Sequence, residues 1–245
     1  LFAADGSDFK IPHNPDHPAS HYDGTNGQSP YNLFHLDAMY DLLQHTYQDV
    51  ALGGDREMNE RKSLCSMVDR SDIKNAIVIA DRGYENYNLM AHIQEKGWHY
   101  LITYETVVTN LGSIQFPVTE LKKLYAMRWG IETSFRKLKY TVGLLHFHSK
   151  KVELIYQEIY AKLIMYNFTE LITSHVIVHK LNTKYVYKAN FTVAVHLCRQ
   201  LFLGNISPPD LEALIRKNVS PVRPGRSRPR TLTAKYAVSF LYRVA

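Results

Sequence analysis

The sequence predicts an α/β protein in which a mixed five-stranded sheet is flanked by helices and followed by an extended helical C-terminal part. Strand-like segments fill residues 2–52, a β-α-β unit follows over residues 76–103, and the remaining two-fifths of the chain is mainly helical. The chain has 245 residues, of which 45% are hydrophobic. This composition excludes disordered and collagen-like chains and is sufficient for one large core or two small ones.

The strands are expected where apolar residues cluster between turn signals. The run AIVIA at residues 76–80 is continuously apolar and ends at Asp81, which is typical of a buried central strand. The expected strands cover residues 2–4, 9–11, 32–40, 43–52, 76–80 and 98–103. Apolar residues at helical spacing and the stop signal at Gly97 predict the helices. These cover residues 58–69, 86–96, 118–140, 152–180, 190–203 and 208–217.

Charge divides the chain into an acidic and a basic half. Residues 1–103 contain 8 Lys and Arg against 15 Asp and Glu, whereas residues 104–245 contain 21 against 8. The segment 215–245 carries eight cationic side chains and no acidic one. A basic field of this kind favours a polyanionic partner, and a solvated basic tail that aids solubility is the alternative.

Other features of the sequence indicate the cellular location of the protein. The most apolar region, residues 154–178, is interrupted by polar side chains, so no membrane span and no membrane partner are expected. Cys65 and Cys198 belong to no C-x-x-C pair, which argues against a disulfide framework and a cysteine zinc site. We therefore expect a cytoplasmic protein. The opening residues LFAADGSD contain no initiator Met and no signal peptide, so we expect the natural N-terminus to lie further upstream.

The helix expected around Glu132 has a polar face beside its apolar stripe. Projected at about 100° per residue, five side chains fall within an arc of about 80°: Tyr125, Arg128, Glu132, Arg136 and Lys139. Charges four residues apart are common on solvated helices, so a salt-bridged surface is one interpretation. A single carboxylate among three cations and a tyrosine instead suits a metal-bound acid flanked by groups that hold phosphates.

Two aspartates follow expected strands. Asp81 comes directly after the buried strand, where open α/β sheets place ligand and metal groups, and Asp5 ends the apolar stretch LFAA. A turn or helix cap is the alternative for each. If the two strands are neighbours, the carboxylates converge, and with Glu132 they offer the oxygen ligands that Mg²⁺ or Mn²⁺ prefers. Two such ions could activate a nucleophile and stabilise the leaving oxygen of a phosphodiester.

Three motifs resemble a known family. The spacing Tyr125-x2-Arg128-x3-Glu132-x6-Lys139 is similar to the Y-R-E-K signature of DDE-type insertion-sequence transposases of the insertion-sequence-four group. DGSD at residues 5–8 resembles the family's first-aspartate motif, and IADRGYENYNL, which begins at residue 79, resembles its second. The resemblance covers roughly residues 1–205.

This resemblance implies a ribonuclease H-like fold and a catalytic core. It implies that Asp5, Asp81 and Glu132 form the catalytic, metal-binding triad, with two Mg²⁺ or Mn²⁺ ions. The signature positions implied to hold DNA phosphates and the distorted nucleotide at the transposon end are Tyr125, Arg128 and Lys139. We add Arg82 and Arg136 as DNA-backbone contacts, on charge and placement alone.

The resemblance also implies a reaction and partners. Members of the family use water to free a 3′-hydroxyl at the transposon end, and that hydroxyl then attacks target DNA. Double-stranded DNA is therefore the expected partner, with a homodimer in the synaptic complex and a bacterial, nucleoid-associated location.

We expect a catalytic domain over residues 1–150, a helical C-terminal region over residues 151–217 and a basic tail over residues 218–245. Members of the family usually carry a β-rich insertion before the glutamate helix and an N-terminal DNA-binding region. Here the stretch near residues 103–118 is short, and strand one begins almost at residue 1. Two alternatives thus stay open: a cleavage-incompetent, DNA-binding remnant of a transposase, and a stand-alone ribonuclease H-like nuclease.

Overall fold

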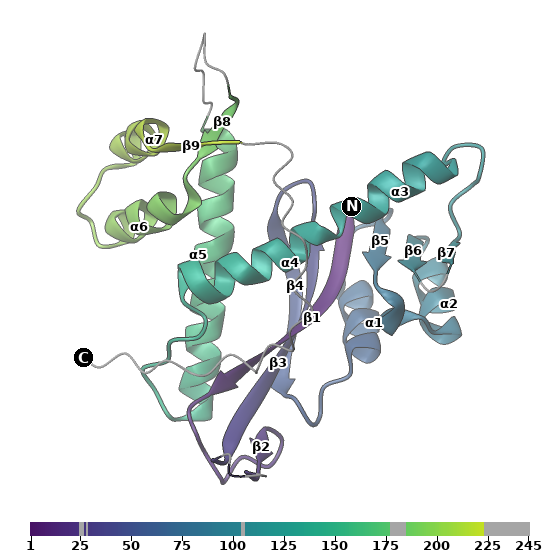
Figure 1. Cartoon of the computed structure of the whole chain (residues 1–245), viewed down its shortest axis with the longest axis horizontal. Coiled ribbons are helices and arrows are strands. Elements are labelled where there is room, and N and C mark those ends of the chain that lie inside the picture. Colours follow the sequence, from purple (N-terminus) through teal and green to yellow (C-terminus); the bar gives the residue numbers. More distant parts are fainter. Residues whose placement is uncertain (25–26, 28, 104–105, 177–184, 223–245) are drawn as a thin grey trace.

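The computed structural model describes residues 1–24, 27, 29–103, 106–176 and 185–222, and its main feature is a mixed sheet (Figure 1). Within these residues β3, β1, β5, β6 and β7 follow one another across the sheet, and β2 and β4 both pair with β3. The strands are β1 Phe2–Ile11, β2 His21–Tyr22, β3 Tyr31–Asp41, β4 Thr46–Gly54, β5 Ile77–Ala80, β6 His99–Thr103 and β7 Val107–Thr109. β1 is antiparallel to β3 and parallel to β5.

The predicted mixed sheet is confirmed, but two details of the strand prediction were wrong. The sheet has seven strands rather than five, because the short strands β2 and β7 extend it. The expected strands 2–4 and 9–11 form one strand, since β1 pairs with β3 without interruption from Phe2 opposite Asp41 to Ile11 opposite Asn32. Asp5 therefore lies within a strand and not in a turn.

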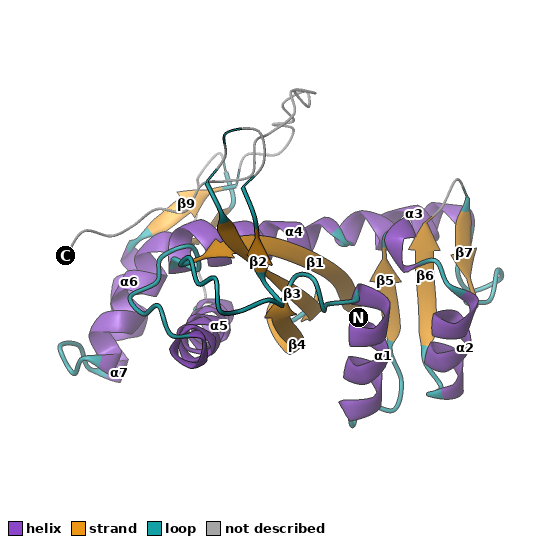
Figure 2. Cartoon of the chain, turned by 90° about the horizontal axis from the view of Figure 1, so that it is seen from below, coloured by secondary structure: helices purple, strands orange, loops and turns teal. Residues whose placement is uncertain are grey.

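Helices cover both faces of the sheet. The alternation of side chains along β1 sends Ala3 and Phe9 into a core shared with α4 and α5, and Phe2 and Ala4 into a second core shared with α1 and α2. Figure 2 shows α1 and α2 beneath β5 and β6, with α3 and α4 on the opposite side. These helices are α1 Glu60–Arg70, α2 Tyr87–Glu95, α3 Val118–Met127, α4 Trp129–Arg136 and α5 Val152–His175.

A further correction concerns the single helix predicted over residues 118–140. In the structure Arg128 separates two helices there, α3 and α4. The N–H of Arg128 donates to the Tyr125 carbonyl and that of Ile131 to the Arg128 carbonyl, so the helix tightens to three-residue spacing there. After α4 the residues Lys137–Val142 form a π-helical turn, which ends at Gly143 with a φ of 94°. The side chains of this region therefore do not share one regular helical face.

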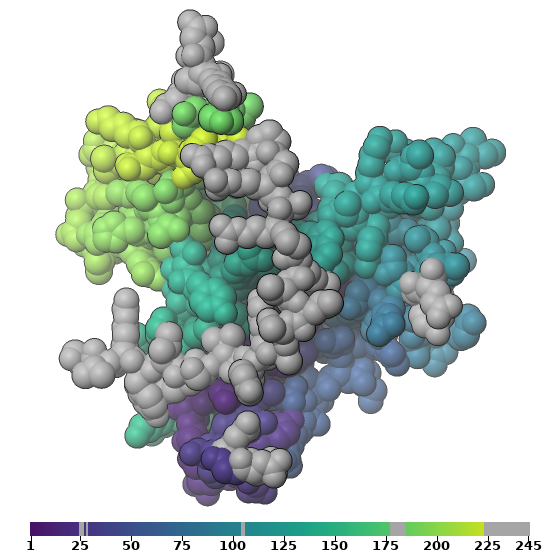
Figure 3. Space-filling view, viewed as in Figure 1, coloured from purple at the N-terminus to yellow at the C-terminus, as the bar shows by residue number. Residues whose placement is uncertain are grey.

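The C-terminal part packs around a third core. It consists of α6 Phe191–Phe202 and α7 Pro208–Lys217 against the end of α5, with β8 Tyr187–Ala189 paired to β9 Val219–Pro221. Figure 3 shows the atoms of this part, green to yellow, gathered together at the upper left of the molecule. The helix expected to reach residue 180 ends at His175, and residues 177–180 and the tail 223–245 lie outside the described residues. No described helix has the length and apolarity needed to cross a lipid bilayer.

A substitution at Ile131 tests how α4 is packed against the sheet. Its side chain is fully buried in the core between α4, α5 and the sheet. Replacement by alanine should leave a cavity and lower the free energy of unfolding by about 2–5 kcal/mol. Urea denaturation measures the loss, and Met127→Ala, at a partly exposed position of α3, should stay within about 0.5 kcal/mol of the parent. Equal effects of the two substitutions would contradict the packing described.

Candidate active site

Two of the predicted acidic residues lie on neighbouring strands. Parallel pairing places Ala4 of β1 opposite Ala80 of β5, so Asp5 is the next residue of β1 and Asp81 is the residue that directly follows β5. The two strands are neighbours, which is the condition under which the carboxylates were expected to converge. Asp81 also caps the short 3₁₀ helix Arg82–Tyr84, where its Oδ1 accepts a hydrogen bond from the N–H of Gly83 at 2.8 Å. This cap fixes the carboxylate at the end of β5.

Arg128 joins the strand to the helix. Its Nη1 lies 3.3 Å from Oδ2 of Asp5 and its Nη2 lies 2.8 Å from Oε1 of Glu132. The guanidinium is buried and lies over the rings of Tyr125 and Trp129, with centroids at 5.6 and 5.4 Å. One buried cation thus brings the carboxylates of β1 and α4 together.

The electrostatics of Asp5 follow from its surroundings. The pKa of Asp5 is raised to about 6 in total: burial is the largest cause, Arg128 and the N–H of Gly6 oppose it, and the charges of Asp81 and Glu132 add to the rise. The charges of both other predicted triad members therefore affect the pKa of Asp5. The three carboxylates form one electrostatically coupled group, and a cation near Asp5 stabilises its charged form.

The remaining predicted DNA-binding residues have different surroundings. The Tyr125 hydroxyl accepts a hydrogen bond from Thr103 Oγ1 at 2.7 Å, and Lys139 Nζ donates to the Asp8 carbonyl at 2.7 Å. Burial lowers the pKa of Lys139, and Asp8 opposes that shift. Arg82 and Arg136 are both exposed, the first after β5 and the second at the end of α4. The two arginines therefore lie at the surface near the site and not within it.

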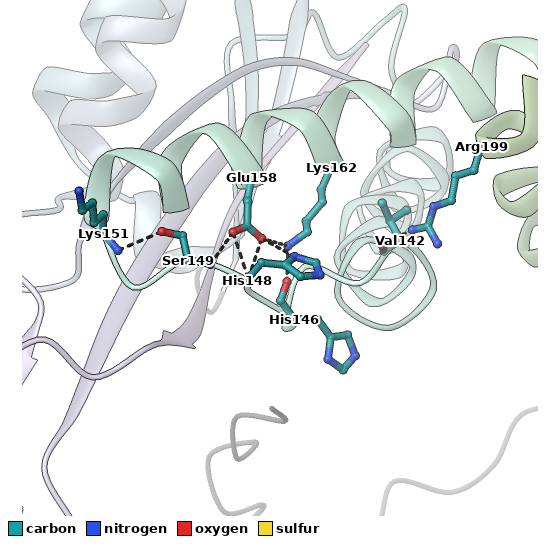
Figure 4. A network of polar contacts seen from close by, with 8 residues as sticks. All are labelled: Val142, His146, His148, Ser149, Lys151, Glu158, Lys162 and Arg199. Carbon is teal, nitrogen blue, oxygen red and sulfur yellow. Dashed lines mark hydrogen bonds and ion pairs between the residues drawn. The ribbon is translucent and has the colours of Figure 1, made fainter. Parts of the chain in front are cut away.

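The loop after the π-helical turn is fixed to α5 and α6, as Figure 4 shows. The carboxylate of Glu158 accepts hydrogen bonds from the backbone N–H groups of His148 and Ser149 at 3.0 and 2.9 Å. Lys162 donates to the carbonyl of His146, and Arg199 donates to that of Val142 at 2.7 Å. The chain that follows Lys139 is thereby held against the helical C-terminal part.

Sequence reasoning missed a second charged cluster. His35 lies 2.5 Å from Asp8 through Nδ1, 2.7 Å from Asp37 through Nε2 and 3.6 Å from Glu60 through Nε2, with Asp55 at 3.9 Å from Nδ1. Burial lowers the pKa of His35, but the hydrogen bonds to Asp37 and Asp8 outweigh it and raise the pKa to about 10. Asp5 and Asp8 are three positions apart, so this cluster lies on the sheet face opposite Asp5. The alternating His-x-Asp pattern of β3 was the available signal.

A comparison with solved structures shows that the fold is similar to that of a transposase. The chain is similar to the piggyBac transposase in a cryo-EM structure of its synaptic complex with hairpin DNA, with a TM-score of 0.51 and 10% identity. The similarity covers 92% of this chain and 59% of that one, so the chain spans less than two-thirds of that protein. At this identity the likeness shows the fold, and it confirms the predicted ribonuclease H-like mixed sheet with flanking helices.

The family is shown by its sequence model. The model described as the transposase DDE domain matches residues 1–168, which is more than half of the chain. The protein belongs to this family of transposase DDE domains. A search of curated proteins finds no match.

The raised pKa of Asp5 predicts a pH-dependent stability effect. An acid whose pKa is raised on folding destabilises the native state once it ionises, between its unfolded value of 3.8 and about 6. In EDTA at pH 7.5, Asp5→Asn should therefore raise the free energy of unfolding by about 2–3 kcal/mol, at 1.36 kcal/mol per pKa unit. Urea denaturation over pH 3.5–7.5 measures this gain, which should vanish at the acidic end. A loss of stability at pH 7.5 would contradict the assigned environment.

Proposed function

We propose that the protein is a DNA transposase of the insertion-sequence-four group, which cleaves transposon ends in a metal-dependent reaction and transfers the freed 3′-hydroxyl into target DNA. Asp5, Asp81 and Glu132 are its proposed catalytic, metal-binding residues. One observation carries the proposal: the paired strands β1 and β5 bring Asp5 next to the residue that follows β5, Asp81, and Arg128 forms ion pairs with both Asp5 and Glu132 of α4.

The donor set fits the proposed metal ions. Three carboxylates provide the hard oxygen ligands that Mg²⁺ and Mn²⁺ prefer. Asp5 is buried beside the charges of Asp81 and Glu132, which is unfavourable for its ionised form unless a cation compensates. When bound, two such ions would activate the attacking oxygen and stabilise the leaving oxygen of the phosphodiester.

Residues of the chain itself hold the carboxylates and the proposed DNA-contacting side chains in position. Arg128 fixes the carboxylates of Asp5 and Glu132 relative to each other, and the Gly83 N–H fixes that of Asp81. We propose that Tyr125 and Lys139 contact DNA phosphates at the transposon end. The hydrogen bond from Thr103 fixes the Tyr125 hydroxyl, and the one that Lys139 donates to the Asp8 carbonyl fixes Lys139 on β1. Preorganised groups of this kind lower the barrier without forming a covalent intermediate.

Double-stranded DNA is the proposed partner. The 21 Lys and Arg against 8 Asp and Glu in residues 104–245 support it, because a duplex carries a phosphate charge about every 1.7 Å along its axis. The reaction joins two transposon ends to one target, so we propose a homodimer in the synaptic complex.

Cleavage of DNA tests the assignment directly. Asp81→Asn and Glu132→Gln should each abolish Mn²⁺-dependent nicking of supercoiled and linear duplex DNA, since each removes a charged ligand. Agarose gels of the DNA products measure nicking, and a supplied target duplex reveals strand transfer.

Glu120→Gln is the matched control, because Glu120 pairs with the exposed Lys123 on α3 and should be replaceable without loss of cleavage. Nicking that survives loss of Asp81 and Glu132 would overturn the assignment. Salt-sensitive binding without nicking by the parent would indicate the DNA-binding remnant instead, and nicking without strand transfer would indicate the stand-alone nuclease.

Arg136 should contribute a phosphate contact. Arg136→Ala is expected to reduce the slope of log K against log salt concentration by about 1 and to weaken binding to all sequences alike. Fluorescence anisotropy over a salt series measures the slope. Lys74→Ala is the control, because Lys74 is exposed just before β5, at the end of the strand away from Asp81. Equal slopes for the parent and Arg136→Ala would exclude this contact.

A further inference from the structure

The face of the sheet opposite Asp5 carries the second charged cluster. Register pairs Asp8 with His35 and Gly6 with Asp37, so the three polar side chains lie on one face of β1 and β3. Glu60, at the start of α1, lies against them from the helix layer. Two elements of the sheet and one helix thus converge on a single histidine.

The donor geometry around His35 is that of a histidine metal ligand. Such a histidine usually donates its second ring N–H to a carboxylate, which fixes the ring and raises its basicity. Here Nδ1 lies 2.5 Å from Asp8 Oδ1, while Nε2 faces Asp37 Oδ1 at 2.7 Å and Glu60 Oε1 at 3.6 Å. Ligand atoms of His35, Asp37 and Glu60 all lie within 4.8 Å of one another.

Asp37 supplies an independent observation. Its side chain is fully buried, and its Oδ2 has no hydrogen-bond partner among the described residues. A buried carboxylate oxygen without a partner costs free energy that a bound cation would recover. The Asp37 carboxylate lies on the same face as His35 and Glu60. Its Oδ2 is therefore available to a cation bound by this cluster.

Gly6 provides the space for this arrangement. A Cβ at Gly6 would lie 2.5 Å from both Glu60 Oε1 and His35 Nε2, closer than real contacts allow. The strand residue beneath the cluster therefore has to lack a side chain if His35 and Glu60 are to approach each other. This requirement is separate from any role of the neighbouring Asp5.

We propose that His35, Asp37 and Glu60 bind one divalent transition-metal ion, with Asp8 orienting His35 from behind. One imidazole nitrogen with two carboxylates is a mixed set that suits Zn²⁺ or Mn²⁺ and leaves a position for water. The ion takes the place of a proton on Nε2. It binds on the face of the sheet opposite Asp5 and Glu132, so the proposal does not depend on the proposed function.

Counting bound zinc tests the proposal. A background variant, Asp5→Asn with Asp81→Asn and Glu132→Gln, removes the carboxylates of the proposed catalytic site, and it should retain one Zn²⁺ per chain after dialysis, measured by mass spectrometry of the metal. Competition with a chromogenic chelator should show that Glu60→Gln weakens Zn²⁺ binding at least tenfold. Glu57→Gln, at an exposed position three residues earlier, should not change it.

The His35 ring provides a second measurement that does not depend on the stability of a variant. In ¹⁵N NMR of the background variant, Zn²⁺ should shift Nε2 of His35 while Nδ1 keeps its proton. A ring protonated on both nitrogens at saturating Zn²⁺ would overturn the proposal and leave His35 as an imidazolium between carboxylates. Absence of retained zinc, or an unchanged affinity in Glu60→Gln, would overturn it as well.

Discussion

The parallel pairing of β1 with β5 is the constraint on which the candidate site depends. It places Asp5 and Asp81 at equivalent positions of adjacent strands, about one strand spacing apart, without help from any other element. The pairing needs a crossover connection, which α1 supplies together with the antiparallel strands β3 and β4. The segments between β1 and β5 therefore form the connection that lets these two strands pair side by side.

The helix break at Arg128 follows from the same geometry. A regular helix over residues 118–140 would carry Tyr125 and Arg128 along its own surface, whereas Arg128 has to reach Asp5 on β1 as well as Glu132 one turn away. The three-residue hydrogen bonds on each side of Arg128 tighten the helix there, while Arg128 itself keeps helical backbone angles, with a φ of −51° and a ψ of −34°. Burying an arginine is unfavourable unless carboxylates and aromatic rings compensate, and Asp5, Glu132 and the Tyr125 ring do so.

Much of the fold could be predicted from local sequence signals, because the apolar run before Asp81 and the helical spacing of later segments depend on burial alone. The signature spacing likewise located Arg128 and Glu132. The continuity of β1 could not be predicted, since DGSD has the composition of a turn and is extended only because residues 35–38 pair with it. The His35 cluster was missed for a similar reason: its members come from β1, β3 and α1, and their proximity depends on strand register and on the space at Gly6.

Strand β1 therefore serves two charged groups, one on each face, and this has an electrostatic consequence. Asp81 also affects a carboxylate of the second group, as the raised pKa of Glu60 shows: burial contributes most, followed by Asp37, while His35 opposes the rise and Asp81 and Asp8 add to it. Each face compensates its own carboxylates locally, through Arg128 on one side and His35 on the other. Because Asp81 and Glu60 interact, a cation bound at either group also lowers the cost of ionisation at the other. The two charged groups are thus coupled through Asp81 and Glu60, whose carboxylates both lie near Gly83.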